Sequence, residues 1–319
     1  MKVSMKTLGI GAGLLAFYGA MEFGIRMGFI NDFFQLIIFL IGMNIILATS
    51  LNLINGFTGQ FSIGHAGFMA IGAYVSAVLT VKFAFPFFGA LIIGGLAAAF
   101  VGLLIGIPTL RLKGDYLAIA TLGLGEIIRI SILNINYVSG ASGFMGIPQY
   151  TNWTWVFFVT AATVIIIRNF LASTHGRACI SIRENEIAAE AMGINTTKYK
   201  VMAFTIGSFF AGISGALFSH YFFIAHPTSF TFLKSVEVLI FVVLGGLGSL
   251  TGSIVAAIFV TVLFAVLQPW PELRMSIFAL VLIITMIYRP SGLMGNMEIT
   301  DLFKKFKKEE GEAGGIARG

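Results

Sequence analysis

Long apolar segments, separated by short polar ones, run through almost the whole chain. Eight of these segments have about the length that a helix needs to cross a bilayer, which is roughly 20 residues. We predict spans at residues 7–25, 33–54, 61–81, 87–110, 116–133, 153–168, 200–222 and 271–289. A further apolar run, 236–267, is interrupted by Gly245, Gly246, Gly248 and Gly252. Its length suits either one strongly tilted span or a hairpin of two half-helices, and we interpret it as a re-entrant hairpin. The pattern therefore predicts an all-α polytopic transmembrane bundle with about eight spans plus one re-entrant or broken helix.

The composition supports a membrane protein. Of the 319 residues, 57% are hydrophobic and 11% are charged, and the mean hydropathy is +0.94, whereas an average soluble domain is about 25% charged. So few charges cannot cover a soluble surface, and lipid therefore has to be part of the solvent. The single cysteine, Cys179, excludes an internal disulfide and a cysteine-based metal cluster. We interpret it as an inert thiol, and we expect no metal and no cofactor on this chain.

The basic residues predict how the spans are oriented. With a cytosolic N-terminus, fifteen of the twenty Lys and Arg residues fall in cytosolic segments, and Arg129 lies within a span. The remaining four lie in outer segments: Arg26, Lys82, Lys234 and Arg274. Because basic residues favour the cytosolic side, we predict that both termini are cytosolic in a bacterial inner membrane. The net charge of +6 reflects this orientation and does not indicate nucleic-acid binding. We expect one membrane domain, 1–300, and a polar, disordered tail, 301–319.

A polar, charged loop, 169–199, separates the sixth and seventh predicted spans. In it, Ser181 and Glu184 match a capping box, and Gly193 suits a left-handed helix end. We predict a helix of about 11 residues between these signals. Its narrow apolar face would contain four residues: Ile187, Ala188, Ala191 and Met192. Such a helix can lie in a groove on a soluble partner, or it can simply pack on its own bundle.

Two segments, 52–72 and 245–253, are rich in glycine and polar residues although they lie within or beside predicted spans. Interrupted helices are tolerated in membranes where they line a cavity or are buried in protein. We predict that the two segments, with Glu126, contribute to a translocation pathway. The candidate residues are Thr58, Gly59, Gln60, Ser62, His65, Glu126, Gly245, Gly246 and Gly248. His65 suits either packing or lining of the pathway, and Glu126 either lies beside the pathway or forms a structural pair with Arg129, three residues later.

Five segments resemble motifs of bacterial ABC importer permeases. Residues 186–193, EIAAEAMG, resemble the coupling-loop signature of this class. Residues 51–73, LNLINGFTGQFSIGHAGFMAIGA, resemble the first signature of the branched-chain amino acid permeases. Residues 114–129, GDYLAIATLGLGEIIR, are similar to the LivM branch of that family. Residues 243–252, VLGGLGSLTG, and 289–295, RPSGLMG, also resemble family motifs.

The resemblance implies a membrane subunit, not an enzyme, of an importer for branched-chain amino acids. It implies a second related permease, two cytosolic ATP-binding subunits and an external substrate-binding protein as partners, with membrane lipid around the chain. ATP would be used by the partners, and the sequence contains no G-x-x-x-x-G-K-[ST] loop. The implied coupling residues are Arg183, Glu186, Ala188, Ala189, Glu190 and Gly193. Urea or short-chain amides as the solute, and ion-coupled secondary transport as the mechanism, remain the alternatives.

Overall fold

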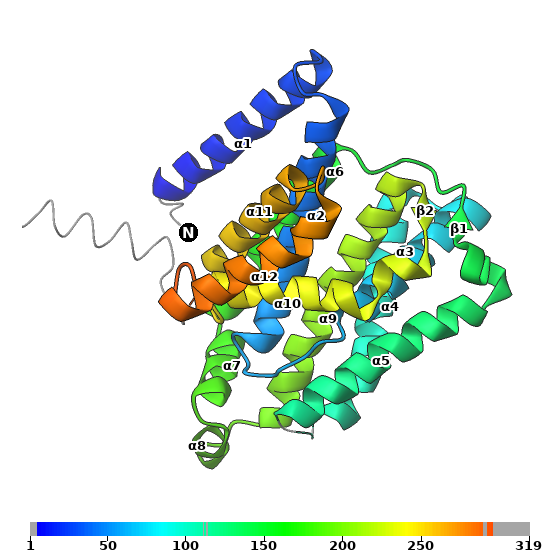
Figure 1. Ribbon diagram of the computed structural model, residues 1–319. Coiled ribbons are helices and arrows are strands. Elements are labelled where there is room, and N and C mark those ends of the chain that lie inside the picture. Colours follow the sequence, from blue (N-terminus) through cyan, green and yellow to red (C-terminus); the bar gives the residue numbers. More distant parts are fainter. Residues whose placement is uncertain (1–4, 111, 113, 290–291, 296–319) are drawn as a thin grey trace, which may run out of the picture.

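The computed structural model describes residues 5–110, 112, 114–289 and 292–295. Within them the chain forms an α-helical bundle with two very short strands (Figure 1). The helices are α1 (Met5–Arg26), α2 (Asp32–Asn55), α3 (His65–Lys82), α4 (Phe87–Thr109), α5 (Asp115–Asn134), α6 (Trp153–Ala172), α7 (Thr174–Glu184), α8 (Glu186–Ala191), α9 (Thr196–Phe222), α10 (Phe232–Gly245), α11 (Leu250–Val266) and α12 (Pro271–Tyr288). The shorter elements are η1 (Asn136–Val138), η2 (Gly140–Ser142), η3 (Pro227–Phe230), β1 (Phe144–Met145) and β2 (Ile224–Ala225). The predicted tail 301–319 lies outside the described residues.

The predicted all-α polytopic bundle is confirmed. In the described part of the chain, six helices combine the length and the apolar composition of a membrane crossing: α2, α3, α4, α5, α6 and α9. α1 and α12 coincide with the first and last predicted spans. α3 begins at His65 rather than at residue 61, because the chain after α2 first turns through a loop in which Gly59 has a φ of +68°.

α10 and α11 form the predicted hairpin of half-helices. Lys234, near the start of α10, and Gln268, just after α11, border the same cavity, so the two helices run in opposite directions. At the tip, Gly246 and Gly248 have φ values of +111° and +86°, which favour glycine. The Ser249 hydroxyl then accepts a hydrogen bond from the Gly252 amide at 3.0 Å and caps α11.

The centre of the bundle is packed through glycines on α3, α4 and α9. A Cβ added to Gly72 of α3 would overlap the backbone of Gly212 on α9, and one added to Gly94 of α4 would lie 2.9 Å from the Gly72 carbonyl oxygen. Small residues let helix backbones approach closely, and this close approach favours helix association in lipid. The three helices therefore form a rigid block beside α2.

Gly72→Ala is expected to destabilise the protein, because the added methyl group meets backbone atoms of Gly212 that cannot move aside alone. Overpacking of this kind costs about 1–3 kcal/mol. Gly123→Ala on α5 is the matched control, since nothing lies within 4 Å of its added Cβ. The measurement is thermal unfolding of the detergent-solubilised protein, and equal melting temperatures for the two variants would contradict the packing.

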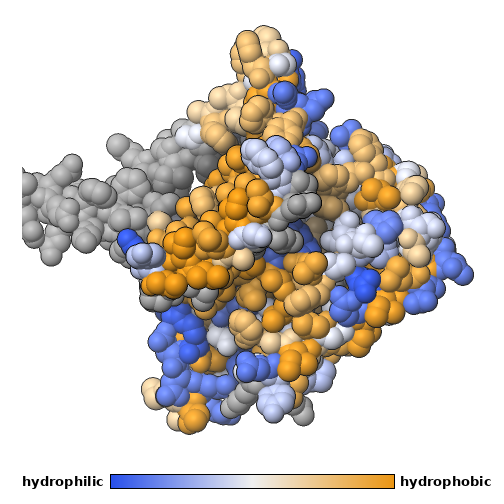
Figure 2. Space-filling view, viewed as in Figure 1, coloured by the Kyte–Doolittle hydropathy of each residue, from blue (hydrophilic) through white to orange (hydrophobic). Residues whose placement is uncertain are grey.

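α7 and α8 project from one end of the bundle (Figure 1). Figure 2 shows apolar surface over α11 and α12, hydrophilic surface over α7, and both kinds of surface at the tip formed by α8. On α5, exposed apolar side chains such as Ile119 and Ile127 are 67% and 60% accessible. Apolar flanks with a polar protruding end are the distribution expected of a bundle whose sides face lipid.

Candidate functional site

The loop between α6 and α9 contains two helices rather than the single predicted one. The expected capping box is wrong: Ser181 lies inside α7, and its hydroxyl donates to the Ala178 carbonyl at 2.9 Å. α7 instead begins at Ser173, whose hydroxyl accepts from the Gly176 amide at 3.3 Å. Glu184 pairs with Arg183 instead of reaching back to Ser181. A serine inside a helix can bond to a carbonyl of the preceding turn, and this competes with its role as a cap.

α8 has its own signals for its start and its end. The Asn185 side chain accepts from the Ala188 amide at 3.0 Å and so caps the helix at its N-terminus. The predicted left-handed end at Gly193 is confirmed, with φ at +85°. The Gly193 amide donates to Glu190 and the Ile194 amide to Ala189, at 2.9 and 3.1 Å, which is the Schellman arrangement. The six-residue helix is therefore stabilised by its two ends.

The apolar face predicted for this segment is exposed. Ile187 is 77% and Met192 is 83% accessible, and Ala188 and Ala191 lie exposed between them. Two apolar side chains of this size, exposed together at the tip of a protruding helix, form the kind of patch that a partner covers. We call these four residues the α8 face.

The predicted coupling residues divide into two groups. Ala188, Glu190 and Gly193 are exposed at the tip. Ala189 is 4% accessible and packs against the protein, and Glu186 forms an ion pair with Lys200 of α9 at 2.7 Å. The inward group therefore attaches α8 to its own bundle, and the outward group is free to meet another subunit.

Arg183 joins the loop helices to both interrupted segments. Its Nη1 donates to the Gly56 carbonyl at the end of α2, at 3.1 Å. The same guanidinium lies against Gly248 at the tip of the hairpin, where any Cβ would overlap it. Gly59 also contacts the Arg183 stem, since its added Cβ would be 3.3 Å from the Arg183 Cγ. Arg183, Gly56, Gly59 and Leu247 line a common cavity of about 430 Å³. We call the contacts of Arg183 with Gly56, Gly59 and Gly248 the Arg183 junction.

Asn52, fully buried in α2, fastens the hairpin tip to α2. Its Nδ2 donates to the Ser249 carbonyl and to the Ser253 hydroxyl, each at 2.8 Å. Its Oδ1 accepts from the Gly248 amide at 3.0 Å. Both polar atoms of the Asn52 side chain are thereby paired, as buried polar groups require. The two glycine-rich segments are thus brought together, as the pathway prediction needed, although Asn52 was not among the predicted residues.

Of the predicted pathway residues in segment 52–72, Gly59 is exposed, and the others are buried: Thr58, Gln60, Ser62 and His65. Thr58 donates to the Ile54 carbonyl at 2.5 Å, and the Ser62 backbone exchanges hydrogen bonds with the Asn55 side chain. His65 Nε2 lies 2.9 Å from the Ser50 hydroxyl. Among the buried side-chain atoms of the described residues, Gln60 Nε2, Gln60 Oε1 and His65 Nδ1 have no hydrogen-bond partner. Their contact with a translocation pathway stays a prediction.

Glu126 holds two elements together. It pairs with Arg129 at 2.7 Å, as the three-residue spacing predicts. Its other carboxylate oxygen accepts from the Phe232 amide, the first of α10, at 3.1 Å. A carboxylate at a helix N-terminus satisfies a free amide and interacts favourably with the helix dipole. This geometry favours the structural interpretation of Glu126, as an anchor between α5 and the hairpin.

Sequence comparison extends these observations. The family model of the branched-chain amino acid transport system, permease component, matches residues 9–286. The chain belongs to this family. This permease is 37% identical over 285 residues to the high-affinity branched-chain amino acid transport system permease protein LivM of Escherichia coli K12, covering 78% of the chain and 67% of the relative.

More distant relatives of this permease include the corresponding protein LivH of Salmonella typhimurium, at 25% identity over 80% of the chain and 92% of the relative. A probable branched-chain amino acid transport permease protein LivM of Methanocaldococcus jannaschii is 24% identical over 82% and 93%. No solved structure matches the chain. The family match includes both loop helices, the Arg183 junction and the hairpin, so all of these features lie within the family's own domain.

Proposed function

We propose that this permease is one of two related membrane subunits of an ABC importer that moves branched-chain amino acids across a bacterial inner membrane. The names of its relatives support the solute class. LivM and LivH of Escherichia coli K12 are two different permease proteins, and both are similar to this chain. Their similarity supports a transporter built from two related permeases. No observation favours urea, amides or ion coupling.

One observation supports coupling to ATP-binding subunits above all others: the α8 face is exposed while its base is fixed to the bundle. A partner that closes and opens on the α8 face would move α7 as well. Through the Arg183 junction, that motion reaches the end of α2 and the tip of the hairpin together. In this proposal, ATP binding and hydrolysis in the partners rock these elements and expose the pathway alternately to the two sides.

The proposed orientation places α7, α8 and both termini in the cytosol, and cysteine labelling tests it. Burial raises the pKa of the Cys179 thiol in α7 to about 11, so this thiol is neutral at pH 7 and becomes a thiolate only in strong alkali. A cysteine at the exposed position 192 keeps an ordinary pKa of about 8.5. Met192→Cys is therefore expected to react with a maleimide on the order of a hundredfold faster than Cys179 near pH 7.

A membrane-impermeant maleimide should label Met192→Cys in inside-out vesicles and not in intact cells. The unsubstituted permease is the control for background from Cys179. Labelling of Met192→Cys in intact cells would place α8 outside and overturn the orientation. Protection of this cysteine by added ATP-binding subunits would support the docking of those subunits at the α8 face.

The function itself is tested by uptake of radiolabelled leucine, isoleucine and valine. Deleting the permease from its native cells should remove uptake, and restoring it should restore uptake. At constant cellular ATP, an ionophore should leave uptake intact, whereas ATP depletion should stop it. Uptake that collapses with the ion gradient at full ATP would support secondary transport instead.

A further inference from the structure

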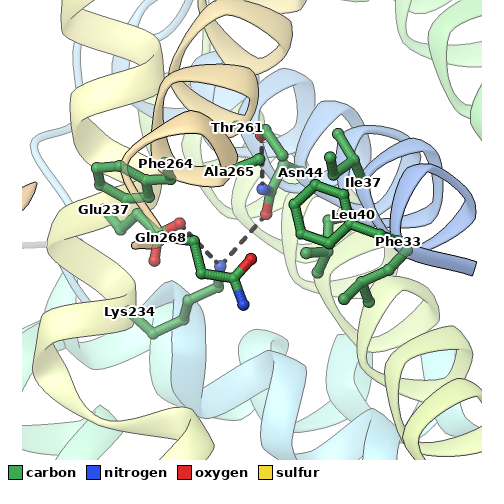
Figure 3. Close-up of a pocket in the computed structure, with 11 residues that line it drawn as sticks. Phe33, Ile37, Leu40, Asn44, Lys234, Glu237, Thr261, Phe264, Ala265 and Gln268 are labelled. Atoms are coloured by element: carbon green, nitrogen blue, oxygen red, sulfur yellow. Dashed lines mark hydrogen bonds and ion pairs between the residues drawn. The ribbon is translucent and has the colours of Figure 1, made fainter. Parts of the chain in front are cut away.

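A second cavity, distinct from the Arg183 junction, lies between α2 and the α10–α11 hairpin (Figure 3). Its volume is about 300 Å³, at the lower end of the range for small-molecule sites, about 300–1,000 Å³. Its walls are mostly apolar and include Phe33, Leu36, Ile37, Leu40, Phe264 and Ala265. A cavity of this size suits a small solute rather than a peptide.

One side of this cavity contains a connected set of polar groups. Lys234 Nζ donates to the Asn44 carbonyl oxygen, Oδ1, at 3.3 Å, and Asn44 Nδ2 donates to the Thr261 hydroxyl at 2.9 Å. Lys234 also faces the Glu237 carboxylate at 3.3 Å. These contacts come from three helices, and Figure 3 shows the side chains converging on the cavity, with Gln268 beside them.

The two charged side chains are partly shielded from solvent by the bundle. The Lys234 and Glu237 side chains are 18% and 25% accessible. Lys234 reaches Asn44, which lies twelve residues into α2 and hence about 18 Å along the helix from its first residue. The Lys234 side chain therefore lies beside the middle of α2, whereas the sequence places Lys234 among the charges of an outer loop. Ionisable groups at such depth are costly in a membrane, face the bundle interior or a cavity, and mark solute pathways.

The chemistry of the cavity complements one class of solute. A free α-amino acid carries a carboxylate and an ammonium group on the same carbon and so needs a cation and an anion close together. Lys234 and Glu237 provide this pair, and both of their contacts, at 3.3 Å, are longer than a strong charged hydrogen bond. An aliphatic side chain would lie against Ile37, Leu40 and Ala265. When Lys234 and Glu237 exchange their contact with each other for contacts with the solute, every charge stays paired with an opposite charge.

We propose that this cavity is a transient binding site for zwitterionic aliphatic amino acids, with Lys234 meeting the carboxylate and Glu237 the ammonium group. The inference rests on the proposed function and names the residues that the solute contacts in passage. It also explains why α2 and the hairpin are the elements to which the Arg183 junction connects. These elements form the walls of the cavity, so their motion changes its shape.

Photolabelling of the complete transporter tests the site directly. The probe is a leucine analogue that bears a diazirine on its side chain, supplied with the substrate-binding protein and ATP. In the unsubstituted permease, the label is expected on α2 near Leu40 or on α11 near Ala265. Lys234→Met and Glu237→Gln should each reduce it at least about tenfold, and Lys234→Arg should retain it in part. Lys82→Met, which removes a lysine that donates to Tyr137 far from this cavity, is the matched control.

A second measurement separates solute contact from general damage. Ala265→Phe narrows the cavity and should therefore exclude a large solute more than a small one. The ratio of leucine uptake to uptake of free alanine should fall roughly tenfold, since pockets discriminate single methylene groups by about this factor or more. Val255→Phe adds the same bulk on an exposed part of α11 and should leave the ratio unchanged. If the unsubstituted transporter carries leucine but the label lies elsewhere, or the ratio does not move, the site is overturned and the importer assignment stands. If it carries no branched-chain amino acid, the proposed function itself fails.

Discussion

Arg183→Met is expected to abolish most solute uptake while the permease still folds and the partner subunits still hydrolyse ATP. Arg183 makes the contact that ties the loop helices to the ends of both α2 and the hairpin. A hydrogen bond from a charged donor contributes about 1.5–3 kcal/mol, and a coupling free energy of this size corresponds to roughly tenfold to hundredfold. Methionine retains the length and the apolar stem but cannot donate to Gly56. The motion of α8 would then no longer reach the hairpin.

Two assays on the same reconstituted transporter test this expectation: uptake of leucine into liposomes, and release of phosphate from ATP. Arg177→Met is the matched control, because Arg177 also donates to a backbone carbonyl, that of Ala172 at 3.1 Å, but only within the loop. We expect the Arg177 variant to remain coupled. If uptake and ATP hydrolysis both fall in the Arg183 variant, the transporter has lost its assembly. If uptake is unchanged, the Arg183 junction does not take part in coupling.

Asn52→Leu is expected to cause the largest loss of stability, at least about 2 kcal/mol. The substitution removes three hydrogen bonds between α2 and the hairpin and leaves the half-buried Gly248 amide without its acceptor. An unpaired buried donor costs about 1–3 kcal/mol by itself. Leucine keeps the branched arrangement of non-hydrogen atoms of asparagine, but its methyl groups neither donate nor accept hydrogen bonds.

Thermal unfolding in detergent gives the stability, and proteolysis near 246–249 reports whether the hairpin tip has come loose. Asn134→Leu is the control, since the Asn134 side chain is exposed and bonds only to its own helix, at Ile130. A melting temperature equal to that of the control, with an equally protected tip, would show that Asn52 does not hold the hairpin. Loss of uptake with normal stability would instead make Asn52 a part of the moving machinery.

The outline of the fold could be predicted because the membrane imposes it. A helix that crosses lipid has to be apolar along about 20 residues, so the eight spans appear as runs in the sequence. The glycines at 245–248 likewise predict the interruption between α10 and α11, since Gly246 and Gly248 adopt backbone angles that other residues avoid. Gly193 predicts the end of α8 for the same reason. These signals are local. The structure confirms the helical bundle and both glycine signals, and six helices of its described part are long and apolar enough to cross a membrane.

The start of the loop helix was predicted wrongly because two local signals compete. Ser181 and Glu184 satisfy the spacing of a capping box, but Ser173 and Asn185 provide caps on either side. Packing decides between these patterns: α7 buries Cys179 and Ile182 against the bundle. A helix that began at Ser181 would not place these two residues on one buried turn. The correct reading needs the neighbouring helices.

The sequence by itself determined that this protein is a bundle of membrane helices with a broken hairpin and a helix in its polar loop, because apolar length, glycine and caps act on the chain locally. The tertiary structure alone decided that Arg183 reaches Gly56, that Asn52 binds the hairpin tip, that Glu126 caps α10 and that Lys234 faces Asn44. Each of these contacts joins residues more than one hundred positions apart. Hydrogen bonds act over about 3 Å, so only the packing of the helices brings such partners within reach.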